Sequence, residues 1–330
     1  MHERIGFMKK LVSVLMSALL VMGMFCSCGS QDPVSVGNSE SIQVVTTIFP
    51  EYDWVMHVLG DNPAEMEVSL LLDNGVDLHS YQPTTEDVLK ISTCDLFIYV
   101  GGESDAWVDD TLREAANPDM VLINLIDVLG DAVKEEETVE GMQEEEEEEE
   151  TPAWDEHVWL SLKNTSIFVD QISAALQMAD PDHAEVYKKN AQSYAKQLQT
   201  LDETYQTTVA SASHHTLLFG DRFPFRYLVD DYGLDYYAAF VGCSAETEAS
   251  FETITFLSQK VDELQLPAVM TIDGSDGQIA ETIVANTQTK DQPILVLDSM
   301  QSATAKQIAD GKTYLSVMED NLEVLRKALQ

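Results

Sequence analysis

The chain has 330 residues, which is long enough for two domains, and 45% of its residues are hydrophobic, which is ample material for buried cores. Its formal net charge of −40 argues against binding to nucleic acid or to an anionic membrane surface, because both need basic patches. Such a negative field concentrates cations, which are therefore the expected class of ligand.

The N-terminus predicts export and a lipid anchor. The segment MKKLVSVLMSALLVMGMFCSCGS, which starts at Met8, has two lysines, a short apolar run and then small residues, as secretory signals do. The run is too short to form a stable membrane-spanning helix. It resembles a bacterial lipoprotein signal (residues 1–28) with Cys28 as the lipidated residue, because a small serine precedes Cys28 whereas a bulky phenylalanine precedes Cys26. The alternative is an ordinary cleaved signal with two incidental cysteines. With a polar tether at 29–40, we expect an extracytoplasmic protein anchored to the cell membrane.

Strand-like and helix-like segments alternate along the rest of the chain. The strands are short, continuous apolar runs, a pattern that favours parallel sheets covered by helices on both faces. The predicted strands are 42–48, 67–72, 95–100, 120–125, 216–220, 234–241, 268–272 and 293–297. The predicted helices that cover them are 51–60, 83–92, 107–116, 224–232, 251–264, 276–286 and 313–328.

The middle of the chain divides this pattern into two lobes. The N-terminal lobe is expected at 41–162 and includes an acidic loop at 135–150, and the C-terminal lobe is expected at 211–330. Linking helices fill 163–210, and the second of them, about 183–209, has no glycine or proline. At a rise of ~1.5 Å per residue it spans roughly 40 Å, enough to run from one lobe to the other. The prediction is an α/β protein with two parallel-sheet lobes, a long linking helix and a ligand cleft between the lobes.

Polar side chains follow several of the predicted strands. Ligands of such sheets bind outside the carboxyl ends of the strands. His79 follows the strand 67–72, and His157 follows the acidic loop. Three carboxylates follow strands of the C-terminal lobe: Asp221, Asp273 and Asp298. We therefore expect two imidazoles and several carboxylates to converge on the cleft.

These segments also resemble a known family. VSLLLDNGVDLHSYQPTTEDVLKISTCDLFIYVGG, DEHVWLS, FRYLVDDYGL and LVLDSM resemble, in this order, motifs of the metal-binding solute-binding proteins of zinc and manganese ABC transporters. The resemblance covers about 41–330. It implies metal ligands at His79 and His157 and a last carboxylate ligand at Asp298.

One position departs from the family pattern. The family usually has a His or Glu ligand just before the FxYxxxxYG helix, where this chain has Arg222. An arginine stays protonated and cannot bind a cation. We expect the neighbouring Asp221 to serve as the ligand, with a salt bridge to Arg222 or Arg226 as its rival role and Asp273 as a weaker rival ligand.

The resemblance implies a receptor that captures zinc and delivers it to an ABC permease. Manganese is the alternative ion, because two imidazoles and two carboxylates suit either metal. The acidic loop, which has no histidine, either concentrates cations or only adds solubility. A monomer without enzymatic activity is expected. Less favoured alternatives are a secreted metallohydrolase, for which no His-Glu-x-x-His motif is present, and an adhesin.

Two cysteines lie beyond the predicted signal, Cys94 and Cys243. A disulfide between them is possible outside the cytoplasm. Burial as two small hydrophobic residues is the other interpretation, and the one that their separation into different lobes favours.

Overall fold

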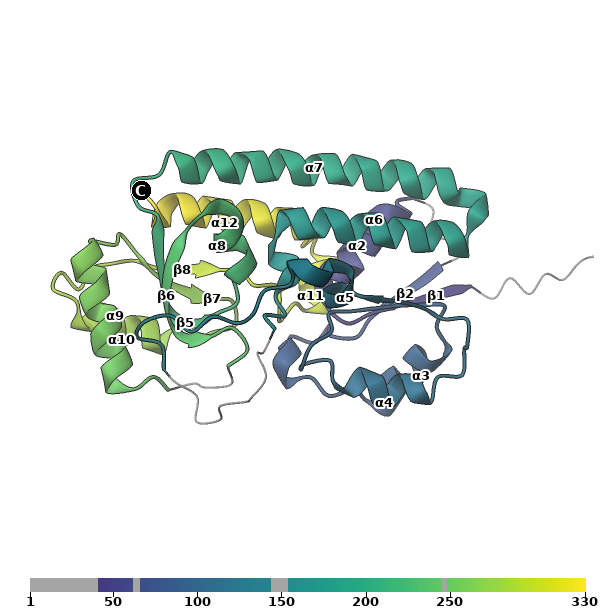
Figure 1. Ribbon diagram of the computed structural model, residues 1–330, viewed down its shortest axis with the longest axis horizontal. Coiled ribbons are helices and arrows are strands. Elements are labelled where there is room, and N and C mark those ends of the chain that lie inside the picture. Colours follow the sequence, from purple (N-terminus) through teal and green to yellow (C-terminus); the bar gives the residue numbers. More distant parts are fainter. Residues whose placement is uncertain (1–40, 62–65, 144–153, 245–247) are drawn as a thin grey trace, which may run out of the picture. The chain divides into compact units, whose positions relative to one another are not determined.

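The computed structural model describes residues 41–61, 66–143, 154–244 and 248–330 (Figure 1). Residues 41–330 form one compact unit. The predicted signal peptide, Cys28 and the tether lie outside the described residues. Among the helices of the described ranges, none combines the length and the apolarity that crossing a membrane requires.

The protein contains two four-stranded parallel sheets, as the sequence predicts. The strand orders are β2-β1-β3-β4 and β6-β5-β7-β8. All eight predicted strands are confirmed, with ends that differ by a few residues. Their bounds are β1 Ile42–Thr46, β2 Met66–Leu70, β3 Leu96–Tyr99, β4 Val121–Asn124, β5 Thr216–Phe223, β6 Asp235–Val241, β7 Val269–Ile272 and β8 Ile294–Leu297. One difference matters for the site: β5 continues past Gly220, with a shift in its pairing with β6 between Phe219 and Arg222.

Helices cover both faces of each sheet (Figure 1). In the N-terminal lobe α2 and α6 lie on one face and α3 and α4 on the other, and in the C-terminal lobe α9 and α10 lie opposite α8 and α12. Two five-residue helices, α5 and α11, are too short for a periodicity to reveal. The bounds are α2 Phe49–Leu59, α3 Thr85–Thr93, α4 Trp107–Arg113, α5 Leu125–Leu129, α6 Leu162–Ala179, α7 Ala184–Ala210, α8 Arg226–Tyr232, α9 Phe251–Leu264, α10 Gln278–Asn286, α11 Ala305–Ala309 and α12 Tyr314–Ala328.

The predicted linking helix is α7, which has 27 residues. Its buried side chains recur every three or four positions and form one apolar face, as expected for a helix that packs along one side. At one end Asn190 donates from Nδ2 to the carbonyl oxygen of Val58 in α2, at 3.0 Å. At the other end Tyr205 donates from its hydroxyl to the carbonyl oxygen of Met318 in α12, at 2.6 Å. The helix is therefore hydrogen-bonded to both lobes.

A continuous hydrophobic core also joins the lobes. One cluster of buried side chains extends from β1 and α2 through α6 and α7 to β5, α8 and α12. Buried hydrogen bonds cross the same boundary: Trp159 donates from Nε1 to the carbonyl oxygen of Ser299 at 2.9 Å, and the backbone N–H of Tyr314 donates to Asp53 Oδ2 at 3.0 Å. A wide opening of the lobes would break these contacts, which makes local movements around the site less costly than a separation of the lobes.

The first part of the acidic segment is bonded to the C-terminal lobe. Glu136 Oε1 accepts a hydrogen bond from the backbone N–H of Cys243 at 3.0 Å. Gln143 donates from its backbone N–H to Ala239 at 3.0 Å, and its side chain accepts from the backbone N–H of Ser250 at 2.7 Å. This portion of the segment, which we expected to belong to the N-terminal lobe, thus contacts β6 and the loop before α9. The glutamate run at 144–150 lies outside the described residues.

Candidate metal centre

His79 lies in a short 3-10 helix, η1 (Leu78–Ser80), in the loop after β2. The side chain of Asp77 caps this turn, because its Oδ1 accepts the backbone N–H of His79 at 3.0 Å. The imidazole Nδ1 is 2.7 Å from Ser104 Oγ. An Nδ1–H that donates to this hydroxyl leaves the lone pair of Nε2 free, which is the form that binds a metal.

His157 precedes the 3-10 helix η3 (Val158–Leu160) and is fully buried. Asp155 Oδ1 accepts two hydrogen bonds from it, one from the backbone N–H at 2.9 Å and one from Nδ1 at 3.0 Å. A carboxylate behind Nδ1 fixes the ring orientation and places the proton on Nδ1. His157 therefore also presents a free Nε2 lone pair.

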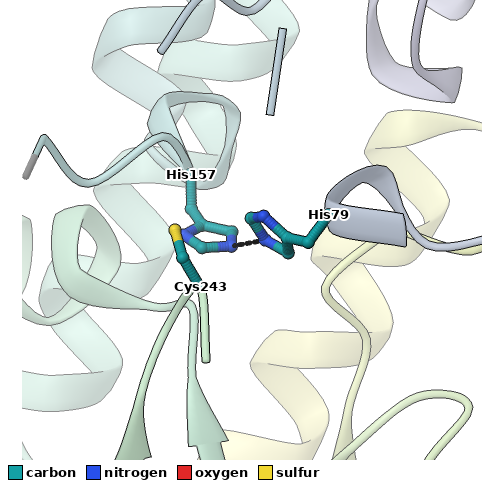
Figure 2. A group of neighbouring side chains, drawn as sticks. All are labelled: His79, His157 and Cys243. Carbon is teal, nitrogen blue, oxygen red and sulfur yellow. Dashed lines mark hydrogen bonds between the residues drawn. The ribbon is translucent and has the colours of Figure 1, made fainter. Parts of the chain in front are cut away.

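The two Nε2 atoms face each other across 3.1 Å (Figure 2). Two nitrogen ligands at about 2.0–2.1 Å from a tetrahedral zinc ion are about 3.3 Å apart. The amide nitrogen of Gln301 lies 2.9 Å from Nε2 of His79 and 2.8 Å from Nε2 of His157. The other end of this amide, Oε1, lies 3.1 Å from Ser299 Oγ, and the NH₂ group is assigned to the histidines because it is the end that can donate to two imidazole lone pairs. The amide protons thus satisfy the two lone pairs that a cation would take.

The surroundings keep His79 neutral. Burial, together with the neighbouring His157 and Arg222, lowers the pKa of His79 to about 2. A neutral imidazole is the protonation state that a metal requires. The Glu156 carboxylate is 3.7 Å from Nδ1 of His79, beyond hydrogen-bond distance, and burial raises the pKa of Glu156.

Asp221 lies inside β5, at the pairing shift, and not after the strand as expected. Its Oδ2 accepts hydrogen bonds from Thr271 Oγ1 at 2.5 Å and from the backbone N–H of Ile272 at 3.4 Å, both in β7. Its Oδ1 accepts the backbone N–H of Arg222. The Arg222 guanidinium pairs instead with Asp77, the residue that caps the His79 turn.

Asp298 follows β8 as predicted and is also bonded within its own lobe. Its Oδ2 pairs with Lys312 Nζ at 2.8 Å, and its Oδ1 accepts the backbone N–H of Met300 at 2.8 Å. Asp273 accepts from the backbone N–H and the hydroxyl of Ser299, at 2.6 and 2.7 Å. Burial, followed by the nearby Asp298, raises the pKa of Asp273.

The structure brings one unexpected side chain to the histidines. In the part of the chain that it describes, the possible metal-ligand atoms of His79, His157 and Cys243 lie within 4.8 Å of one another, and Asp221 and Asp298 are not in this group. Cys94 and Cys243 are both free thiols, so the disulfide is not formed. Burial raises the pKa of the Cys243 thiol, and the carboxylates of Glu136, Glu156 and Asp155 act in the same direction. Cys243 follows the predicted strand 234–241, so the strand-end rule could have found it.

An acidic cavity of about 520 Å³ adjoins the group. Some of the residues that line the cavity lie next to the site residues in the sequence. The carboxylates of the lining give the cavity a negative charge. The charged lining residues are Asp77, Asp221, Arg222, Asp273 and Asp276. The negative lining raises the local cation concentration next to Asp77, the residue that caps the His79 turn.

Two parallel-sheet lobes, a helix that links them and an imidazole pair between them define the class of two-lobed metal-binding solute-binding proteins. Residues 44–328 match the family described as "Zinc-uptake complex component A periplasmic" (ZnuA), and the chain belongs to this family. This confirms the resemblance on which the sequence analysis relied.

Individual relatives agree with this assignment. The zinc-binding protein AdcA of Streptococcus pyogenes serotype M6 is 28% identical over 97% of this chain, which spans about three fifths of AdcA (61%). The high-affinity zinc uptake system protein ZnuA of Bacillus subtilis is 27% identical over 92% of this chain and 93% of its own length. Among solved structures, the Zn(II)-bound ZnuA-like domain of Streptococcus pneumoniae AdcA is 27% identical, with a TM-score of 0.68 over 88% of this chain and 99% of that domain.

Proposed function

We propose that this protein is the extracytoplasmic zinc-binding component of an ABC importer, which captures zinc between its lobes and delivers it to the membrane permease. The observation that carries the proposal is the buried imidazole pair, with Nε2 atoms 3.1 Å apart and both Nδ1 atoms on oxygen partners. Membership of the zinc-uptake family and the Zn(II)-bound neighbour support it.

The proposed ligands from the N-terminal lobe are His79 and His157. Asp221 and Asp298 stay the carboxylate ligands proposed from the sequence. To bind the ion, Asp221 has to leave Thr271, and Asp298 has to leave Lys312. Imidazole ligands suit zinc, and manganese is the alternative cargo.

We further propose that the receptor is a monomer, that a lipid on Cys28 anchors it and that residues 29–40 tether it to the membrane near the permease. The proposed role is transport and not catalysis. A catalytic zinc keeps an open position for water or substrate. Here His157 is fully buried, and the Gln301 amide contacts both Nε2 atoms.

The test is a titration of metal-stripped protein, residues 29–330, with zinc and with manganese. We expect one zinc ion per chain, bound more tightly than manganese, and a large loss of affinity in His79→Ala. The matched control is His183→Ala, because His183 also pairs through Nδ1 with an aspartate, Asp180, but lies at the start of α7. Equal zinc affinity of the wild type and His79→Ala would overturn the proposal.

A further inference from the structure

We infer that Cys243 is a metal ligand of this site, so that a thiolate from the C-terminal lobe binds the same zinc ion as His79 and His157. The inference rests on the proposed function and puts Cys243 in the place of one of the two proposed carboxylate ligands, so that the ion keeps four donors. Figure 2 shows the thiol beside the His157 ring, on the opposite lobe from His79.

A glycine permits the close approach of this loop to His157. A Cβ atom built on Gly242 would lie 2.9 Å from His157 Cε1, 3.1 Å from its Nδ1 and 2.9 Å from the carbonyl oxygen of Phe223. The backbone at the end of β6 is therefore packed directly against the imidazole, and any side chain at position 242 would push it away. As a result the next residue, Cys243, lies within reach of the metal position.

The acidic segment holds Cys243 in this place. Its backbone N–H donates to Glu136 Oε1 at 3.0 Å. This half-buried carboxylate keeps the loop from moving outward, and it also accepts a hydrogen bond from the thiol, which has to turn away from Glu136 to reach an ion. The position of Cys243 is thus defined by both of its neighbours, His157 and Glu136.

The distances allow coordination after a small movement. A sulfur at about 2.3 Å and a nitrogen at about 2.0–2.1 Å from a tetrahedral zinc ion are about 3.5 Å apart. The ligand atoms of the three residues now lie within 4.8 Å of one another. Closing the remaining gap requires a shift of about 1 Å, which a side-chain rotation provides. When zinc enters, the S–H bond breaks, the sulfur binds the ion and the proton leaves to solvent, so the step needs no oxidant or reductant.

The charges of the site also favour a thiolate. Two neutral imidazoles leave the charge of a divalent ion uncompensated in a buried position. The nearby carboxylates of the C-terminal lobe, Asp221 and Asp298, are bonded to Thr271 and Lys312. A thiolate is a soft ligand that zinc accepts readily and manganese does not. Cys243 therefore makes the site more selective for zinc than an all N/O site.

The test is substitution of cobalt(II) for zinc in metal-stripped protein, residues 29–330, which contains the whole compact unit 41–330 and lacks Cys26 and Cys28. A thiolate bound to cobalt gives a near-ultraviolet charge-transfer band. We expect this band in the wild type and in the control Cys94→Ser, and its loss in Cys243→Ser. Zinc affinity of Cys243→Ser, measured by chelator competition, should fall by more than about tenfold, while manganese affinity changes less.

The outcomes separate the two proposals. Wild-type protein that binds one cobalt ion without the charge-transfer band would overturn the role of Cys243 and leave the proposed function intact. A band that persists in Cys243→Ser would do the same, because the thiolate would come from elsewhere. Wild-type protein that binds neither zinc nor cobalt would overturn the proposed function itself. The wild-type spectrum decides the matter even if Cys243→Ser does not fold.

Discussion

The two halves of the candidate metal centre differ in what their polar side chains already contact. In the N-terminal lobe, the oxygen partners of His79 and His157 occupy Nδ1 and leave Nε2 directed at the centre. In the C-terminal lobe, Asp221 and Asp298 are bonded to partners of their own lobe. A polar side chain at a strand end is therefore only a candidate ligand. Whether it can bind an ion depends on whether its donor atoms are already occupied by hydrogen bonds or salt bridges.

The largest expected effect is the loss of an imidazole that is already oriented. Structural zinc sites have binding free energies of about 10–16 kcal/mol, an average of about 2.5–4 kcal/mol for each of four ligands. His157→Ala should therefore weaken zinc binding by about 100- to 1000-fold, measured by competition with a chelator of known affinity. Asp221→Ala and Asp298→Ala, measured in parallel, should lose less, because each carboxylate must give up an existing partner. A larger loss of zinc affinity in either aspartate variant would show that the carboxylates of the C-terminal lobe contribute more to binding than the oriented imidazoles do.

A pH effect on stability is expected in the N-terminal lobe, where Asp105 and Glu156 are buried carboxylates. Burial raises the pKa of Asp105 to about 7, with Glu156 acting in the same direction. The unfolded-state pKa of an aspartate is about 3.9, so between these values the folded state binds more protons. The stabilising contribution is therefore complete at low pH and is lost as the pH rises toward 7. Asp105→Asn should remove this loss, which is on the order of a few kcal/mol in the free energy of unfolding.

Urea unfolding at several pH values measures this effect. The difference in unfolding free energy between Asp105→Asn and the wild type should increase from pH 4 to pH 7. Asp110→Asn is the matched control, because Asp110 is an exposed carboxylate of α4. A constant difference across this pH range would show that Asp105 has an ordinary pKa.

The next largest effect is expected for Asp155, the carboxylate that accepts the hydrogen bond from Nδ1 of His157. Asp155→Asn keeps the shape of the side chain but weakens the hydrogen bond that holds Nδ1–H. Losses of about 10- to 100-fold in metal affinity are typical for such supporting groups. Asp180→Asn is the control, because Asp180 holds Nδ1 of His183 in the same way, away from the site. Equal zinc affinities of the two variants would mean that His157 needs no orienting partner.

Gln301 is a position at which a substitution can add a metal ligand to the C-terminal half of the site. Its amide contacts both Nε2 atoms and competes with an ion for their lone pairs. Gln301→Glu replaces these donors by an anionic oxygen at the same position, so zinc affinity should rise by about tenfold, or ~1.4 kcal/mol. Isothermal titration of the two proteins measures the change. Unchanged or weaker binding would place the ion away from position 301.

The smallest effect is expected for the glutamate run at 144–150. Replacing its seven glutamates by glutamines keeps the length and removes the charge. The rate of zinc association should fall several-fold at low ionic strength and return to the wild-type value at high salt, because salt screens such a field. Stopped-flow mixing with a zinc indicator measures the rate. An equal rate at low salt would leave the run with a role in solubility alone.

The sequence predicted the fold more completely than it predicted the site. The eight strands, the two lobes and α7 follow from apolar runs and helix-forming segments, which are local properties. His79 and His157 stand in distinctive local motifs. The pairing shift that places Asp221 inside β5 depends on the neighbouring strand β6, and the contact of Lys312 with Asp298 depends on tertiary packing. Neither can be read from local patterns.

Two neighbours of the histidines were missed for different reasons. Cys243 follows a predicted strand, but a single cysteine with no other cysteine or histidine close by in the sequence forms no local metal-binding motif. Gln301 is uncharged and lies three residues beyond Asp298, and only the fold shows that its amide reaches both Nε2 atoms.

The most direct measurement is an anomalous difference map, collected at the zinc edge, from crystals of the zinc-loaded protein. We predict one peak between the lobes, at about 2.0–2.1 Å from Nε2 of both His79 and His157. A peak that lies away from both imidazoles, for example among the carboxylates of the acidic segment, would contradict the site described here.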